Sequence, residues 1–300
     1  TSASDSKAYD GTALTNAAVT PGGADGFIAG EGASYNVTGS QTEMGSSNNT
    51  FTYTLNTNTK AANYTITPVN GTLTVTSNQT EIVITAKSAS RKYDGTPLTE
   101  SGYETTGTLP AGHSLRVTVS GSITDAGTET NTAGYKIYNN SNQEVTGSFS
   151  GVTTVNGTLT VSPREVSLTS ASDSKAYDGT ALTNAAVTPG GDGFITGEGA
   201  TYEVSGSQTD VGSSSNAFTY TLNADTKAAN YTITPVNGTL TVTPKLTEIV
   251  ITAASGSRKY DGSPLTNAGY SYTENVLAQG DVLTAVVEGT ITDAGTADNV

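Results

Sequence analysis

Residues 63–75 read Asn-Tyr-Thr-Ile-Thr-Pro-Val-Asn-Gly-Thr-Leu-Thr-Val, with apolar and polar residues alternating on both sides of Asn70-Gly71. Such alternation is typical of a half-buried strand, because successive side chains of a strand point to opposite faces. Asn-Gly between two alternating runs predicts a hairpin, because both turn residues need a positive φ. The string returns at residues 230–242 and, shortened, at residues 152–161. We therefore predict hairpin turns at Asn70-Gly71, Asn156-Gly157 and Asn237-Gly238.

A second string precedes each closing string along the chain. It has a basic residue, one further position and then Tyr-Asp-Gly, and a Leu-Thr pair follows. A later acidic turn has the form Gly-(Ser/Thr)-x-Thr-(Asp/Glu)-x-Gly, as at residues 39–45. The order of these strings defines a tandem repeat with units of roughly 80 residues. The four Tyr-Asp-Gly motifs are Tyr9-Asp10-Gly11, Tyr93-Asp94-Gly95, Tyr177-Asp178-Gly179 and Tyr260-Asp261-Gly262.

The repeats alternate between two types in the order A-B-A-B. Repeat A1 covers residues 1–79, B1 covers 80–164, A2 covers 165–246 and B2 covers 247–300. Thr1 aligns with Thr169, so A1 lacks the strand equivalent to residues 165–168, and B2 stops before its closing strands. The connections between repeats are short, and Pro163 and Pro244 restrict two of them.

Repeat B1 illustrates the strands that the alternation predicts. Turn residues separate the runs at spacings typical of a sandwich. We predict an all-β fold: a tandem array of small, immunoglobulin-like β-sandwich units forming an elongated rod, with a β-grasp-like unit as the alternative. The predicted B1 strands are residues 81–86, 101–106, 114–123, 129–138, 148–155 and 158–161.

Composition excludes several classes of function. The net charge of the 300 residues is −14, whereas nucleic-acid binding needs clustered basic residues and an anionic membrane attracts them. No run of about 18 apolar residues is present, so we expect no membrane insertion in this segment. The chain has no cysteine, which rules out disulfides and thiolate chemistry.

The Tyr-Asp-Gly openings combined with the closing string resemble the YDG and MBG-type repeat modules of large bacterial cell-surface adhesins. The resemblance covers nearly the whole chain. It implies an extracellular or wall-attached bacterial protein with many repeats. It does not imply a known ligand.

The Tyr-Asp-Gly motifs have two interpretations. Their aspartates would allow weak Ca²⁺ binding, but Asp and Gly together are also typical of a turn, and we predict the turn with Tyr as a core or junction anchor. We predict no other cofactor and no metal site. The basic residue two positions before Tyr lies on the same side of the strand. We expect it to pair with the acidic residue of the later turn, namely Glu43, Asp125, Asp210 or Asp293.

Other residues that can carry chemistry are few. Surface adhesins also contain Lys-to-Asn isopeptide crosslinks, and Lys60 and Lys227 are the candidate lysines here. His113 is the single histidine, and we predict an exposed loop residue because it has no partner motif. Asn-x-Thr sequons and Thr-rich strands leave glycosylation open. The absence of a catalytic constellation predicts that the chain is not an enzyme.

The leading functional hypothesis is a structural stalk or fibre-forming region of a secreted or cell-surface adhesin-like protein. Neighbouring repeats are the expected partners, together with other copies of the chain in a filament. The alternative is a set of adhesive repeats that bind host glycan, mucin or matrix, since the 15 tyrosines would stack on sugar rings if exposed.

Overall fold

The computed structural model describes residues 1–23 and 26–300. The prediction of an all-β fold is confirmed, because strands and irregular segments make up nearly all of this part of the chain. A β-grasp unit would place a helix against its sheet, and the described residues contain no α-helix. None of their helical turns is long and apolar enough to cross a membrane. The helical turns are η1 (Ala61–Asn63), η2 (Thr146–Ser148) and η3 (Ala228–Asn230).

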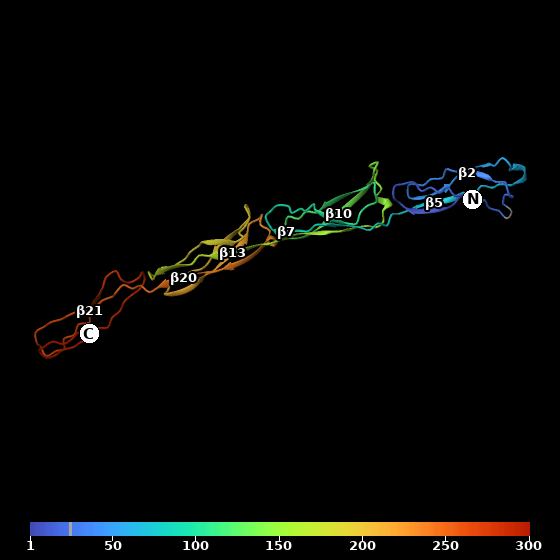
Figure 1. The fold of residues 1–300 in the computed structure, drawn as a ribbon. Coiled ribbons are helices and arrows are strands. Elements are labelled where there is room, and N and C mark those ends of the chain that lie inside the picture. Colours follow the sequence, from blue (N-terminus) through green and yellow to red (C-terminus); the bar gives the residue numbers. More distant parts are fainter. Residues whose placement is uncertain (24–25) are drawn as a thin grey trace. The chain divides into compact units, whose positions relative to one another are not determined.

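The chain divides into two compact units, Thr1–Ser162 and Pro163–Val300. The first unit holds repeats A1 and B1, drawn from blue to green in Figure 1. The strands of A1 are β1 (Asp5–Ala8), β2 (Ala33–Val37), β3 (Gly45–Asn49), β4 (Phe51–Leu55) and β5 (Gly71–Thr76). Those of B1 are β6 (Ile82–Ala86), β7 (Ala89–Lys92), β8 (Tyr103–Thr106), β9 (His113–Ser120), β10 (Gly127–Asn139), β11 (Val152–Val155) and β12 (Gly157–Ser162).

The second unit holds repeats A2 and B2. In B2 the structure forms two short strands, and the 300 residues include no counterpart of β11 or β12. The strands of A2 are β13 (Arg164–Ser170), β14 (Asp173–Ala176), β15 (Val187–Gly191), β16 (Ala200–Val204), β17 (Gly212–Asn216), β18 (Phe218–Leu222), β19 (Tyr231–Val236) and β20 (Gly238–Thr243). Those of B2 are β21 (Ile251–Ala253) and β22 (Tyr270–Tyr272).

In A1, B1 and A2 the beginning and the end of the repeat lie side by side. In B1, β6 pairs in parallel with β11 in a sheet of order β11-β6-β8. The next strand, β7, pairs in parallel with β12 in a second sheet of order β7-β12-β10-β9. A2 repeats this arrangement, with β13 parallel to β19 and β14 parallel to β20. The opening pair of strands and the closing pair therefore pass between the same two sheets, and they do so next to each other.

The Asn-Gly pairs mark this change of sheet, so the predicted hairpins at Asn70-Gly71, Asn156-Gly157 and Asn237-Gly238 are wrong. The strands that flank Asn156-Gly157 lie in different sheets, and so do those that flank Asn237-Gly238. None of the three glycines has a positive φ. Glycine is required there by close approach, because a Cβ atom at Gly157 would lie 2.3 Å from the carbonyl oxygen of Lys87.

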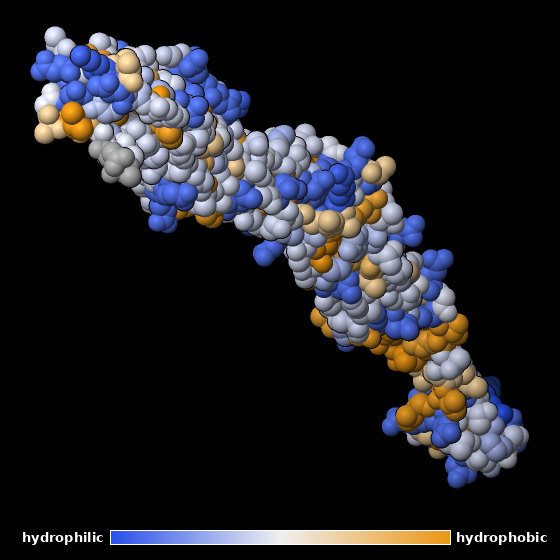
Figure 2. Space-filling view, turned by 90° about the vertical axis from the view of Figure 1, so that its right-hand side faces the viewer, coloured by the Kyte–Doolittle hydropathy of each residue, from blue (hydrophilic) through white to orange (hydrophobic). Residues whose placement is uncertain are grey.

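The closing strands supply the centre of each core. Along β5, β12 and β20 every second residue is buried, and Leu73, Leu159 and Leu240 are fully buried. The alternating threonines face outward, which suits the low apolar content of the chain. Figure 2 shows the result: the face in view is mostly of intermediate hydropathy, with scattered hydrophilic and smaller hydrophobic patches.

Candidate functional site: the Tyr-Asp-Gly junctions

Each Tyr-Asp-Gly motif forms a tight turn closed by its own aspartate. In A1 the Oδ1 atom of Asp10 accepts hydrogen bonds from the backbone N–H and the hydroxyl of Thr12, both at 2.8 Å. Gly11 has φ +77°, a conformation that glycine adopts without strain. The same backbone bond to aspartate and the same positive φ recur at Gly95, Gly179 and Gly262.

The basic residue of each motif pairs with the aspartate of the same motif. Lys7 lies 2.8 Å from Asp10, and Lys175 lies 2.7 Å from Asp178. In the B repeats the Arg91–Asp94 and Arg258–Asp261 distances are both 3.1 Å. The expectation of a pair with the later acidic turn is wrong at Glu43, Asp210 and Asp293, and at Asp125 it stays a prediction. The turn itself folds the aspartate back toward the strand that carries the basic side chain.

This pairing changes the acidity of the aspartates. The hydrogen bond from the Lys7 ammonium, followed by that from the Thr12 backbone, lowers the pKa of Asp10 to about 2. The pKa of Asp178 is lowered as well, chiefly by Lys175. In Asp94 and Asp261 the backbone N–H two residues on is the main cause of the lowered pKa. A carboxylate that already accepts from an ammonium or guanidinium group is a poor ligand for Ca²⁺.

The tyrosine of the first motif packs against the following repeat. Tyr9 is 1% exposed. Its ring lies edge-on to Phe149, with centroids 5.8 Å apart, and to His113, with centroids 5.6 Å apart. Both partners belong to B1. Aromatic pairs in this geometry contribute about 0.5–1.5 kcal/mol beyond their buried area.

The linker between A1 and B1 is tied to the same tyrosine. The buried side chain of Asn78 donates from Nδ2 to the carbonyl oxygen of Tyr9 at 2.7 Å and accepts from the N–H of Thr80 at 2.8 Å. The backbone of Asn78 pairs with B1, donating to Ser148 and accepting from Ser150. One side chain and its backbone thus join the end of A1, the linker and B1.

The cores of A1 and B1 are continuous. A single cluster of buried hydrophobic residues includes Tyr9, Leu14, Leu73 and Val75 of A1 together with residues of B1. Its B1 members are Ile82, Ile84, Ala86, Ala133, Ile137, Val145, Phe149 and Val152. Each repeat is near the size at which one core is marginal, so sharing a core adds to the stability of both.

The second A-to-B junction uses the same positions with different side chains. In the second unit the hydroxyl of Tyr177 donates to Asp281 at 3.0 Å. This bond is the first cause of the raised pKa of Tyr177. A Cβ atom at Gly179 would lie 2.5 Å from the carbonyl oxygen of Gln279, so the turn also approaches B2 closely.

His113 and Asp281 are equivalent positions, and each meets the tyrosine of the motif before it. The prediction of an exposed loop at His113 is wrong, because it is the first residue of β9 and is half-buried against Tyr9 and Phe149. Alignment of the two B repeats did not indicate this contact, because the side chains at the aligned position differ. What the two repeats share is the place of this residue in the sequence: it directly follows a glycine, Gly112 or Gly280, and precedes a run of alternating residues.

The B-type motifs differ in burial. The N–H of Tyr93 donates to Ser162 at the end of β12, and Tyr93 is 5% exposed. Tyr260 is 67% exposed, and the 300 residues hold no counterpart of β12 in B2. The closing strand of the same repeat is therefore what holds the motif in place, as the bonds from Tyr9 to Thr76 and from Tyr177 to Thr243 also indicate.

Sequence reasoning missed an asparagine that recurs in every repeat and is fully buried in A1, B1 and A2 and half-buried in B2. Asn216 is fully buried, and its Nδ2 atom donates to the carbonyl oxygens of Ala171 and Asn184, both at 2.9 Å. Ala171 lies where the chain passes from β13 in one sheet to β14 in another, and Asn184 lies in the loop after the Tyr-Asp-Gly motif. The side chain of Asn216 therefore links these two segments. The signal was available, since each asparagine follows the last glycine of the acidic turn at a fixed distance. Its counterparts, which bond in the same way, are Asn49, Asn131 and Asn299.

The candidate crosslinking lysines lie apart from these junctions. Lys60 and Lys227 are exposed and precede η1 and η3. Within residues 1–23 and 26–300, no three His, Asp or Glu side chains gather as metal ligands would. Comparison of the chain with models of known protein families gave no match, and comparison with curated proteins gave none either.

Proposed function

We propose that this chain is a structural region of an extracellular, adhesin-like bacterial surface protein, and that it acts through its length and stiffness. Small immunoglobulin-like sandwich units would stand in tandem as an elongated rod, in a stalk or a fibre. The number of repeats would then determine the length of the rod.

The observation that carries this proposal is the packing of Tyr9 of A1 edge-on against both Phe149 and His113 of B1. A flexible linker would leave the two repeats with separate cores. Here the cores are continuous and Asn78 is held by both repeats. Bending at this junction would expose the buried ring of Tyr9 to water. Because burying an aromatic ring is favourable, the ring's burial resists bending.

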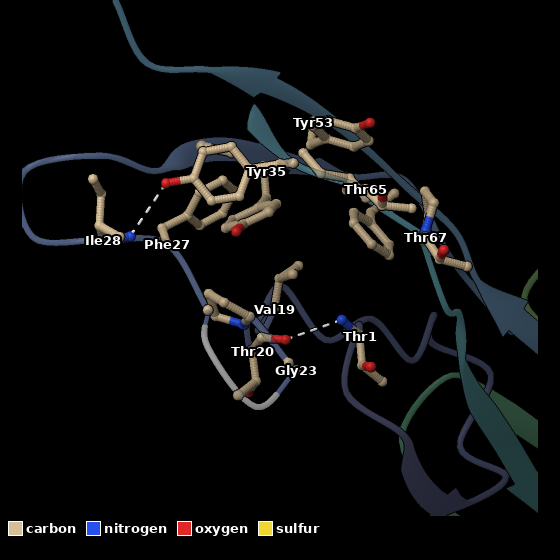
Figure 3. Close-up of a pocket in the computed structure, with 18 of the residues that line it drawn as sticks. Thr1, Val19, Thr20, Gly23, Phe27, Ile28, Tyr35, Tyr53, Thr65 and Thr67 are labelled. Atoms are coloured by element: carbon tan, nitrogen blue, oxygen red, sulfur yellow. Dashed lines mark hydrogen bonds between the residues drawn. The ribbon is translucent and has the colours of Figure 1, made fainter. Parts of the chain in front are cut away.

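The adhesive alternative predicts an exposed aromatic groove in every repeat. A cavity of A1, shown in Figure 3, is lined in part by Tyr35, Tyr53 and Phe51. In A2 the strand β13 lies between the counterparts of two walls of that cavity, so the groove does not recur there. This difference favours the mechanical role over glycan binding.

Small-angle scattering of the chain tests the proposal. A compact protein of this length has a radius of gyration of about 19 Å. We expect a value well above this, together with a cross-section the size of one small sandwich. Substitution Tyr9→Ala should broaden the distribution of distances by loosening one junction, whereas the matched change Tyr260→Ala, at an exposed tyrosine, should not. A radius near 19 Å for the unaltered chain would rule out a rod.

A further inference from the structure

The opening and closing strands of a repeat form two lines of chain that run side by side in the same direction. We call β13 and β14 the opening line of A2, and β19 and β20 its closing line; in B1 the opening line is β6 and β7, and the closing line is β11 and β12. The ladders between the two lines are parallel in both repeats. In A2 they begin at Arg164 with Tyr231 and end at Ala176 with Thr243, and the N–H of Tyr177 adds a further bond to Thr243.

The register between the lines is kept across the change of sheet. In A2 paired residues are 67 positions apart in both ladders, and between the ladders the N–H of Thr239 donates to the hydroxyl of Ser172, also 67 positions away, at 3.0 Å. In B1 the separation is 70 positions in both ladders, and the N–H of Thr158 donates to the hydroxyl of Ser88 at 2.9 Å. Each repeat therefore joins its two lines in one continuous register.

This arrangement decides how a repeat responds to tension along the chain. The chain enters a repeat at the start of the opening line and leaves it at the end of the closing line. Because the lines are parallel, these two points lie at opposite ends of the ladders, and pulling on them slides one line past the other. The evenly spaced bonds of a parallel ladder then share the load, whereas strands that are pulled apart from one end lose their bonds one at a time.

A2 has an additional tie between the lines that B1 lacks. Ser170 is 1% exposed and lies where the opening line changes sheet. Its hydroxyl donates to the carbonyl oxygen of Asn216 at 2.6 Å and accepts from the N–H of Gly238, in the closing line, at 2.9 Å. Ser2 makes the same two bonds in A1, whereas Ala86 stands at this position in B1. The ladder between β13 and β19 also has six pairs, against four between β6 and β11.

We propose that each complete repeat is a clamp for tensile load, and that the parallel ladders between the opening and closing lines are the part that bears it. A2 is the stronger clamp, because Ser170 and the longer first ladder add to the bonds that must break together. Unfolding under force is governed by the barrier to unfolding, so the ladders determine how long a repeat survives under tension. The inference rests on the proposed function in one respect, since a stalk is loaded in tension when its two ends are held apart.

Single-molecule pulling on the full chain tests the clamp. The chain has no cysteine, so a pair of introduced cysteines defines the points of attachment. Pro163→Cys with Pro244→Cys loads the two lines of A2 in shear, whereas Pro163→Cys with Ala229→Cys pulls β13 and β19 apart from one end; all three positions are exposed. We expect the unfolding force in shear to be at least about twofold higher than in peeling. Equal forces in the two directions would overturn the proposal.

A comparison of the two repeats is the second test. Gln79→Cys with Pro163→Cys loads B1 in shear, and we expect B1 to unfold at a lower force than A2. Ser170→Ala should shorten the lifetime of A2 at constant force about tenfold, because one buried tie between the lines is lost. Thr219→Ala is the matched control, since this threonine is exposed on β18, outside both lines, and its loss should leave the lifetime unchanged. A B1 repeat stronger than A2, or equal effects of the two alanine variants, would contradict the role of Ser170.

The pulling experiments and the scattering test of the rod can fail separately. A compact chain whose A2 repeat resists shear more than peeling would end the proposal of a stalk and leave the clamp. An elongated chain whose A2 repeat shears and peels at the same force would leave the stalk and end the clamp.

Discussion

The Tyr177 hydroxyl donates a hydrogen bond to Asp281, the residue that stands where repeat B1 has His113. In B1 the same position presents a ring edge to Tyr9. In both A-to-B junctions the motif tyrosine of one repeat therefore meets the same aligned position of the next repeat, which is the first residue of β9 in B1 and lies outside the strands in B2. The contact is between ring edges where this residue is His113, and it is a hydrogen bond where this residue is Asp281.

Replacing the tyrosine of the first junction should be costly. Tyr9→Ala removes a buried ring from the core that A1 and B1 share, and large-to-small changes of this kind cost about 3–5 kcal/mol. Urea unfolding followed by backbone circular dichroism would measure the loss. Tyr260→Ala is the matched control, because this motif tyrosine is 67% exposed and its loss should change stability by less than about 0.5 kcal/mol. Equal effects would contradict the anchoring role.

The second junction should respond to alkaline pH. The hydrogen bond to Asp281 raises the pKa of Tyr177 above its ordinary value. A folded-state pKa above the unfolded one means that this bond stabilises fully below pH about 10 and is lost as the pH rises through the folded pKa. Nuclear magnetic resonance of labelled tyrosine rings would follow the titration. Asp281→Asn should bring the Tyr177 midpoint down, and an unchanged midpoint would show that the bond does not form in solution.

Alternation predicted where the strands lie but not how they pair. In B1 the predicted runs 81–86, 101–106 and 114–123 overlap β6, β8 and β9, because a buried face leaves a period of two in the sequence. Strand β7 was missed, since Ala-Ser-Arg-Lys has no apolar alternation. The parallel pairing of the opening and closing strands is a contact between distant segments, and no local pattern records it.

The junction was predictable only in part. The motif tyrosine was expected to anchor a core or a junction, but its partners His113 and Asp281 share no chemistry that sequence comparison could match. The buried Asn49 was overlooked because asparagine is common in this chain and usually exposed. Its recurrence at one place in every repeat was the physical clue, since a polar side chain kept at a buried position needs specific partners.

The Asn-Gly pairs offer a direct test of the sheet change against a hairpin. A tight hairpin turn would need a positive φ at both Asn237 and Gly238. In the structure only the glycine matters, because its Cβ would lie 2.4 Å from the carbonyl oxygens of Ser170 and Ala171. Gly238→Ala should destabilise A2 by ~1–3 kcal/mol through overpacking, and Asn237→Ala by less than about 0.5 kcal/mol. Thermal unfolding would separate the two, and a large effect of Asn237→Ala would restore the hairpin.

Acid should weaken the Tyr-Asp-Gly turn of A1 only at very low pH. The pKa of Asp10 is lowered to about 2, mainly by the hydrogen bond from Lys7. Since the folded pKa lies below the unfolded one, the turn keeps its contribution above pH about 4 and loses it as the pH falls toward 2. Carboxyl carbon resonances would give the midpoint. Lys7→Met should move it up toward the ordinary value, and an Asp10 midpoint near 4 in the unaltered chain would argue against the pair.

The buried asparagines should be structural supports that tolerate no change of charge or size. Asn216→Ala leaves the carbonyl oxygens of Ala171 and Asn184 without their donor, at a cost of ~1–3 kcal/mol for each buried group. Asn216→Asp should be worse, because a carboxylate would face two carbonyl oxygens and Gly206, with no room for solvent. The exposed Asn223→Ala is the control, expected to change stability by less than about 0.5 kcal/mol. Chemical unfolding of the three variants should rank them Asp, then Ala, then the control in order of loss; an aspartate variant as stable as the control would mean that the asparagine does not join the sheet change to the loop.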